Sequence, residues 1–239
     1  MKENNTFNMA LLGCFIFLVL SSLGYFLGNA IIEYKLYDRS VKVKGLSERD
    51  LNADIVIWPI QYSIASNKLD GLYQSIDDKN KTITDFLETN NVSSSEITIA
   101  LPSITDKSAQ QYSHNTKAAF RYTAVQTVTV YSKNIKAVRS VMNNLSQLGK
   151  HGIVFTGGNF QSKTEYIFTH LNEVKPEMIA EATRKAREVA QKFAADSESK
   201  LGKIKRASQG QFSIRSRDKN NPHIKRIRVV STVEYYLSD

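Results

Sequence analysis

The longest apolar stretch of the chain lies near its N-terminus, from residue 9 to residue 32, and contains no Asp, Glu, Lys or Arg. At about 1.5 Å per residue, a helix of this length reaches roughly 36 Å, which is enough to cross a hydrocarbon core of about 30 Å. The pattern therefore predicts one transmembrane anchor, preceded by a cytoplasmic N-terminus at residues 1–8.

A cleaved signal peptide is a second interpretation of this stretch, because Gly28-Asn29-Ala30 resembles a small-x-small cleavage site. The apolar run before it is longer than the roughly 7–15 residues usual in a signal peptide, so we favour the uncleaved anchor. A lipoprotein site at Cys14 fits poorly, since bulky Leu12 stands where a small residue is expected. We interpret Cys14 as a small apolar residue of the helix.

After a polar connector at residues 33–40, alternation of apolar and polar residues with period two predicts strands. We expect a short strand and turn at 41–45, then strands at 51–65, 96–105 and 120–131, an extended stretch at 151–170 with a bend at Gly157-Gly158, and final strands at 204–214 and 224–237. Pro59 cannot donate to a ladder and predicts an edge position or a bulge. Residues 106–118 are polar and predict a hairpin loop.

Apolar residues at spacings of three and four predict helices at 67–90, 134–148 and 172–200. Ser66 or Asn67 is expected to cap the first helix, and Ser132 the second. The third helix carries a narrow stripe of mostly small residues, which permits close approach to a sheet or to another helix. The stripe is Met178, Ala182, Ala186, Val189, Phe193, Ser197 and Leu201.

The predicted order of elements is β-β-α-β-β-α-β-α-β-β, and its middle has the β-α-β-β-α-β order of split βαβ folds. The sequence therefore predicts an α+β fold: antiparallel sheets with long helices, containing a split βαβ (ferredoxin-like) core, preceded by one transmembrane helix. No clear linker or repeat interrupts residues 41–239, which we treat as one domain.

The formal net charge of the 239-residue chain is +9, and the excess lies beyond the apolar stretch because Lys2 and Glu3 cancel. A single cysteine excludes an intrachain disulfide, so the fold rests on packing. The cations are densest near the C-terminus, where two strands joined by a turn would gather them at one hairpin end. The candidate polyanion contacts are Arg215, Arg217, Lys219, Lys225, Arg226 and Arg228. No recognised nucleic-acid motif accompanies them, so we expect no nucleic-acid partner.

The sequence offers no constellation of catalytic, cofactor-binding or metal-binding residues. His114, His151, His170 and His223 are far apart and lack the spacing of metal ligands. There is no Gly-x-Ser-x-Gly nucleophile motif, and Leu148-Gly149-Lys150 matches only the end of a phosphate loop. We therefore expect neither enzymatic activity nor a cofactor.

Two segments carry a family resemblance. Residues 41–66 read VKVKGLSERDLNADIVIWPIQYSIAS, and an alanine-rich helix with regularly spaced basic residues at 180–194 precedes Leu-Gly-Lys-Ile at 201–204. In this order the chain resembles the SIMPL-domain proteins, known in bacteria as periplasmic or outer-membrane immunogenic proteins, over about residues 41–238. Trp58-Pro59 departs from the family, whose proline stands earlier in this strand.

The resemblance implies a bacterial envelope location, a tendency to self-associate and a link to stress tolerance, and it transfers no catalytic residue. It also favours a periplasmic domain on an inner-membrane anchor. Taken alone, the positive-inside rule would instead place the domain in the cytoplasm, because Lys35, Arg39, Lys42 and Lys44 follow the apolar stretch. The leading hypothesis is a non-enzymatic, membrane-anchored envelope protein acting through homo-oligomerisation or partner binding. The alternative is a module that binds anionic lipid or envelope polymer through the basic C-terminal hairpin.

Overall fold

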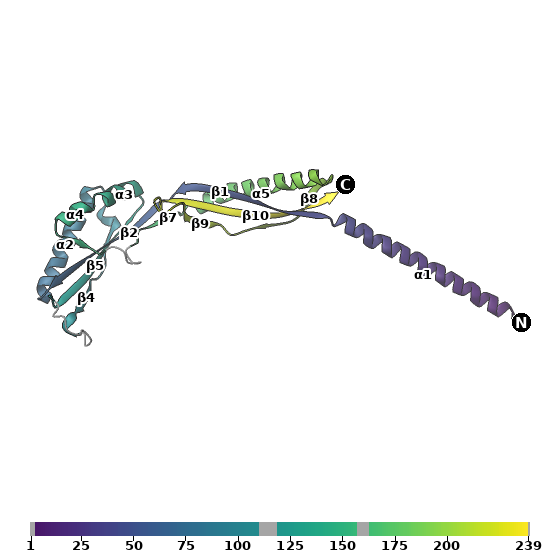
Figure 1. Ribbon diagram of the computed structural model, residues 1–239, viewed down its shortest axis with the longest axis horizontal. Coiled ribbons are helices and arrows are strands. Elements are labelled where there is room, and N and C mark those ends of the chain that lie inside the picture. Colours follow the sequence, from purple (N-terminus) through teal and green to yellow (C-terminus); the bar gives the residue numbers. More distant parts are fainter. Residues whose placement is uncertain (1–2, 110–118, 157–162, 239) are drawn as a thin grey trace. The chain divides into compact units, whose positions relative to one another are not determined.

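The computed structural model describes residues 3–109, 119–156 and 163–238, coloured along the chain in Figure 1. Their contacts divide the chain into two compact units. Unit 1 contains Met1–Glu48, Lys175–Phe212 and Arg228–Asp239, and unit 2 contains Arg49–Val174 and Ser213–Ile227. The single-domain boundary at residues 41–239 stays a prediction. The bend at Gly157-Gly158, His114 and most of the loop at 106–118 lie outside the described residues.

Helix α1 (Glu3–Tyr37) contains the apolar stretch and extends beyond it. The predicted connector at 33–40 is therefore helical up to Tyr37, and strand β1 begins at Ser40. Glu33, Lys35 and Leu36 are good helix formers, and no glycine or proline interrupts them, so polarity alone does not end the helix.

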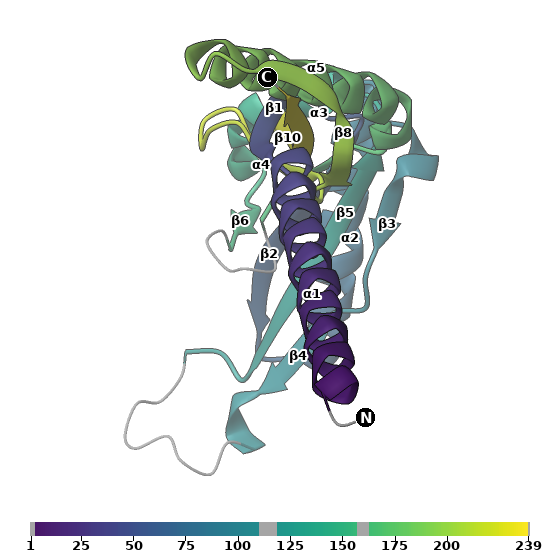
Figure 2. The same ribbon diagram turned by 90° about the vertical axis from the view of Figure 1, so that its right-hand side faces the viewer.

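Unit 1 is built on a sheet in which β10 (Ile224–Ser238) lies between β1 (Ser40–Asn52) and β8 (Lys200–Gln209). Strand β9 (Ser213–Ser216) also pairs with β10. Helix α5 (Leu171–Asp196) runs along these strands in Figure 1 and lies on one side of them in Figure 2. The core between helix and sheet consists of Val43, Ala186, Ala190, Val233 and Tyr235.

The turn predicted at Gly45 is wrong, because β1 continues through this position. Gly45 is buried on the same face as Val43. A Cβ atom built on Gly45 would overlap the carbonyl oxygen of Ala182 and the backbone nitrogen of Ala186. The glycine therefore allows the β1 backbone to touch the α5 backbone.

Close approach by the stripe of α5 is confirmed, but its composition differs from the prediction after Ala186. Its buried residues are Met178, Ala182, Ala186, Ala190 and Ala194. Val189 and Phe193, which were assigned to the stripe, are 38% and 56% exposed. The helix also ends earlier than predicted, since the N–H of Ser199 donates to the carbonyl oxygen of Ala194 and Glu198 adopts a left-handed φ of 53°.

Unit 2 is an antiparallel sheet of order β3-β5-β2-β6, formed by β3 (Ile97–Ile99), β5 (Tyr122–Ser132), β2 (Ile55–Ser66) and β6 (Val154–Phe155). Strand β4 (Ser103–Asp106) also pairs with β5, and β7 (Glu165–Ile167) with β2. Its helices are α2 (Leu69–Thr89), α3 (Ile135–Asn143) and α4 (Ser146–Lys150). The α+β class with antiparallel sheets is confirmed, and the ferredoxin-like assignment stays a prediction.

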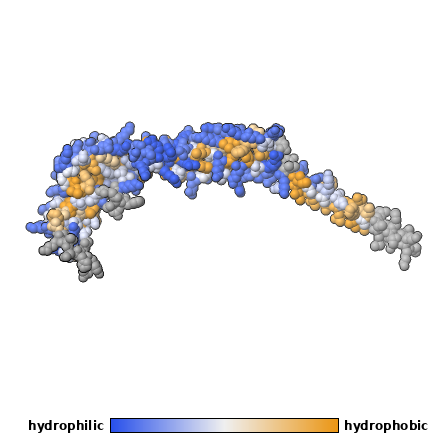
Figure 3. All heavy atoms as spheres, viewed as in Figure 1, coloured by the Kyte–Doolittle hydropathy of each residue, from blue (hydrophilic) through white to orange (hydrophobic). Residues whose placement is uncertain are grey.

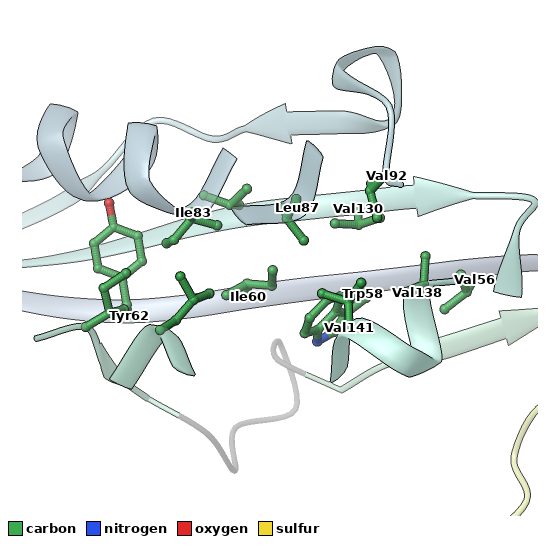
Figure 4. Close-up of a cluster of buried hydrophobic side chains, with 13 residues drawn as sticks. Val56, Trp58, Ile60, Tyr62, Ile83, Leu87, Val92, Val130, Val138 and Val141 are labelled. Atoms are coloured by element: carbon green, nitrogen blue, oxygen red, sulfur yellow. The ribbon is translucent and has the colours of Figure 1, made fainter. Parts of the chain in front are cut away.

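The core of unit 2 confirms the alternation predicted for β2. Val56, Trp58, Ile60 and Tyr62 are all buried on one face. Figure 4 shows these side chains between α2, which supplies Ile83 and Leu87, and α3, which supplies Val138 and Val141. The helices are therefore fixed to the sheet by apolar packing along most of β2.

Asn80 lies in the otherwise apolar stripe of α2 because it has a buried partner. The hydroxyl of Tyr62 donates to Asn80 Oδ1 at 2.8 Å and lies 3.2 Å from the carbonyl oxygen of Ile76. Burial raises the pKa of Tyr62, which keeps the phenol neutral and able to donate.

The edge position or bulge predicted from Pro59 is wrong, because β2 lies inside the sheet and Pro59 pairs in register with Thr129 of β5. Strand β2 pairs with β7 at residues 55–57 and with β6 at residues 62–63. The backbone carbonyl of Gln61, two residues after Pro59 and on the same edge of β2, accepts the backbone N–H of Thr156, next to β6. The proline nitrogen thus falls between the two short partner strands, where no N–H is needed.

Several predicted element ends are wrong. The helix expected at 134–148 divides into α3 and α4, and Asn134 rather than Ser132 caps it, accepting the N–H of Ala137. Neither Ser66 nor Asn67 caps α2, whose N-cap is Lys68 without a side-chain bond. The strand expected at 96–105 is divided into β3 and β4 around Pro102, which lacks the N–H that a ladder requires.

Candidate interaction sites

Helix α1 is the most exposed apolar surface of the described chain. Its residues from Leu12 to Lys35 have the length and hydropathy of a membrane span, with none of the window buried. Phe17 and Phe26 are each 69% exposed, and Figure 3 shows hydrophobic residues along the helix. A surface of this kind requires an apolar environment, which a bilayer supplies. A signal sequence has the same properties.

The basic cluster predicted at the C-terminus lies on β9, β10 and the turn between them, and part of it is neutralised. Arg226 forms a bidentate pair with Asp50, with Nε 2.8 Å from Oδ1 and Nη2 3.0 Å from Oδ2. Arg217 Nε lies 2.8 Å from Asp218 Oδ2. These hydrogen bonds lower the pKa of both carboxyl groups, which are therefore ionised partners at neutral pH.

The same carboxylate of Asp218 also holds the turn, by accepting the backbone N–H groups of Asn220 and Asn221. Lys225 Nζ donates to Ser216 Oγ at 3.2 Å, and burial lowers the pKa of Lys225. The turn predicted around residues 220–222 is thus present. Three cations of the basic cluster, Arg217, Lys225 and Arg226, form hydrogen bonds within the fold.

The remaining members of the basic cluster are exposed. Arg215 and Lys219 belong to unit 2, whereas Arg228 belongs to unit 1. The structure therefore brings five of the six predicted residues into one unit, and of these it leaves Arg215 and Lys219 as the exposed contacts for a polyanion.

A second cationic site lies in unit 2, where β5 passes into α3. A pocket of about 360 Å³ is lined there by Lys133, Lys136, Arg139 and His223, together with Asn52 and Asn134. We call it the α3 pocket. Its lysines and arginine were not predicted from the sequence as a site. Lys136 and Arg139 stand three residues apart at the start of a helix, so they share a face, and this spacing was the available signal.

His223 is held in the α3 pocket by its neighbours. Arg139 Nη1 lies 2.8 Å from His223 Nε2, and the backbone N–H of Ala53 donates to the carbonyl oxygen of His223. Burial lowers the pKa of His223, as do the charges of Arg139 and Arg217. The imidazole is therefore neutral near pH 7.

The other described histidines have different positions. His170 lies at the start of α5, where its Nδ1 is 2.8 Å from Glu173 Oε1 and its Nε2 is 3.1 Å from Asp54 Oδ2. The hydrogen bond with Glu173 raises the pKa of His170. His151 is exposed at the end of α4. Within the described ranges, no group of three or more His, Cys, Asp and Glu residues is arranged to hold a metal ion.

Comparison with known proteins identifies a family but no characterised relative. The family model described as "SIMPL: Protein of unknown function (DUF541)" matches residues 41–232. A search of curated proteins finds no match. The matched region includes the α3 pocket and the strands and helix of unit 1 that surround Gly45. The chain therefore belongs to the SIMPL family.

Proposed function

We propose that this chain is a non-enzymatic, membrane-anchored protein of the bacterial cell envelope. Its folded part faces the periplasm and acts by self-association or partner binding. The observation that carries the proposal is the exposure of α1 along its whole apolar window. The SIMPL match supports an envelope location for the part that follows.

The energy of insertion favours an anchor. Twelve Leu, Ile, Val and Phe residues between Leu12 and Ile32 are each 48% or more exposed. At about 0.3–0.6 kcal/mol per residue, their transfer to the bilayer contributes roughly 4–7 kcal/mol. The flanking charges at Glu33 and Lys35 lie near one end of the helix, where they reach the interface.

The anchor is tested by fractionating cells that express the full chain with a C-terminal tag. We expect it to stay with membranes after an alkaline carbonate wash, to be extracted by detergent, and to keep its original N-terminus. External protease should degrade the folded part in spheroplasts but not in intact cells. A freely soluble product that still begins at Met1 would refute the proposal, and a shortened soluble product would indicate a signal peptide.

Self-association is supported by the edge of the unit 2 sheet. Strand β3 ends the strand order within the described residues, and apolar side chains at or beside it face solvent. Ile99 is 49% exposed and Leu101 is 94% exposed. An edge strand with exposed apolar residues is suited to pairing with another chain.

Light scattering on the detergent-solubilised full chain tests this assembly. Leu101→Asp should weaken self-association about tenfold or more, because burial of a leucine side chain contributes roughly 1.5–3 kcal/mol and a charge cannot replace it. Tyr73→Asp is the matched control, since Tyr73 is 48% exposed on helix α2 and does not lie on an edge strand. A wild-type chain that stays monomeric at high concentration would contradict the proposal.

The alternative function is binding of anionic lipid or envelope polymer by the basic cluster. Arg215 and Lys219 are the exposed cations of unit 2 that favour it. Equal binding of the chain to neutral and anionic vesicles at low salt would refute this alternative.

A further inference from the structure

We propose that the α3 pocket is a binding site for the phosphate group of a small organic phosphate. The site is separate from the membrane anchor and from the β3 edge, and it adjoins the basic cluster through His223, which lies in the turn between β9 and β10. It therefore adds a ligand that the proposed function does not require.

The α3 pocket carries uncompensated positive charge. Lys133, Lys136 and Arg139 line it, and none of its described lining residues is acidic. Arg217 and Arg226 have carboxylate partners within 3 Å, whereas Arg139 contacts the neutral imidazole of His223. Across the described parts of the chain, no carboxylate forms an ion pair with the three pocket cations. Their charge is therefore available to an anion.

His223 contributes a buried donor to the same pocket. Arginine can only donate, so His223 Nε2 must accept from Arg139, and the imidazole proton lies on Nδ1. Nδ1 is buried and has no hydrogen-bond partner among the described residues. A buried donor without an acceptor destabilises the folded state. An anion bound in the pocket that His223 lines would place negative charge near this imidazole.

The backbone adds positive potential at the same place. Helix α3 begins after Asn134, and its N-terminal end carries the partial positive charge of the helix dipole. This potential adds to that of Lys133 and Lys136 on adjoining residues of the chain.

The number of donors and the size of the pocket select the ligand class. Two ammonium groups and one guanidinium match the three or four oxygens of a phosphate better than the two oxygens of a carboxylate. A volume of about 360 Å³ leaves room for an organic part, against which Ile135 and Ala53 present apolar surface.

Calorimetric titration of the full chain in detergent micelles tests the site. The probes are inorganic phosphate, glycerol 3-phosphate and glycerol. We expect saturable binding of both phosphates, with glycerol 3-phosphate the tighter ligand, and no binding of glycerol. Vesicles of phosphatidylglycerol and of phosphatidylcholine, added to the chain in phosphatidylcholine nanodiscs, then distinguish a lipid headgroup from a soluble phosphate as the source.

Substitutions assign the binding to the pocket. Arg139→Gln and Lys136→Gln should each weaken glycerol 3-phosphate binding about tenfold, which is about 1.4 kcal/mol at 25 °C. Lys81→Gln on the exposed side of α2 removes the same charge elsewhere and should leave the affinity unchanged. Both pocket positions are exposed, so the variants are expected to keep the fold, and circular dichroism checks this.

A second readout reports on the imidazole itself. Bound phosphate favours the imidazolium form, so the pKa of His223, followed by NMR, should rise in saturating glycerol 3-phosphate. Absence of saturable binding would overturn the proposal. It would also be overturned if all three variants bound alike, or if binding left the pKa of His223 unchanged. None of these outcomes bears on the anchor, which fractionation tests separately.

Discussion

Replacement of Gly45 by alanine tests the packing of unit 1 most directly. The added Cβ meets two backbone atoms of α5, the carbonyl oxygen of Ala182 and the nitrogen of Ala186. Neither atom can rotate away, so β1 and α5 must separate. This movement opens the core of Val43, Ala186, Ala190, Val233 and Tyr235.

The expected change in the free energy of unfolding follows from two opposing effects. Overpacking of a closed interface costs about 1–3 kcal/mol, and contact with rigid backbone places Gly45→Ala at the upper end. Alanine restricts the unfolded chain more than glycine does and returns about 0.4–1 kcal/mol. We therefore expect a net loss of about 2 kcal/mol. With an m-value of about 2 kcal/mol per molar urea, the midpoint of unfolding should fall by about 1 M.

Urea denaturation of the detergent-solubilised chain, followed by circular dichroism, measures this loss. Gly149→Ala is the control, because Gly149 lies in α4 and a Cβ added there would meet no atom within 4 Å. This control should be neutral or stabilising by up to about 1 kcal/mol. Trp58, the single tryptophan, is buried in unit 2, so its fluorescence reports on that unit. A midpoint for Gly45→Ala within about 0.2 M of wild type would refute the reasoning.

Two further substitutions address unit 2. Tyr62→Phe leaves Asn80 Oδ1 without the hydroxyl donor that lies 2.8 Å away, and it should cost about 1–2 kcal/mol in urea denaturation; unchanged stability would mean that Asn80 finds another donor. The pKa of His170 is raised in the folded state, so its contribution to stability is present below about pH 6.5 and is lost as pH rises through the folded pKa. Melting temperatures of wild type and His170→Gln should therefore differ most at about pH 5.5 and converge by about pH 8, and a constant difference would contradict this origin.

The parts of the fold that local pattern determines were predictable from sequence. Apolar and polar residues alternate along β2 because one face of the strand packs against helices. The residues of the buried face can therefore be recognised in the sequence by their apolar side chains. The helical range of α2 was predictable from apolar spacing, and Asn80 fits the same spacing on the buried face. The partner of Asn80 was not predictable, because Tyr62 reaches it from another element.

The errors in unit 1 share a physical cause. Gly45 predicted a turn because an isolated glycine after a short alternating run usually ends a strand, and only contact with α5 explains a glycine inside β1. On α5, Val189 and Phe193 were assigned to the buried stripe because they are more hydrophobic than Ala190 and Ala194. Where the backbones of β1 and α5 approach this closely, alanine side chains fill the contact, and Val189 and Phe193 lie at the surface.

The two cationic regions show why charge density along a sequence is a weak guide to a binding site. The C-terminal cluster has more cations, but part of it is bonded within the fold, Arg226 to Asp50 and Arg217 to Asp218. Lys133, Lys136 and Arg139 are fewer, but at the start of α3 they line one pocket without a described carboxylate. Affinity for an anion depends on how many positive charges lack an ion-pair partner in the folded state. It also depends on whether these charges lie around the same site. By that criterion, glycerol 3-phosphate should distinguish Arg139→Gln from Lys81→Gln, although both remove one positive charge.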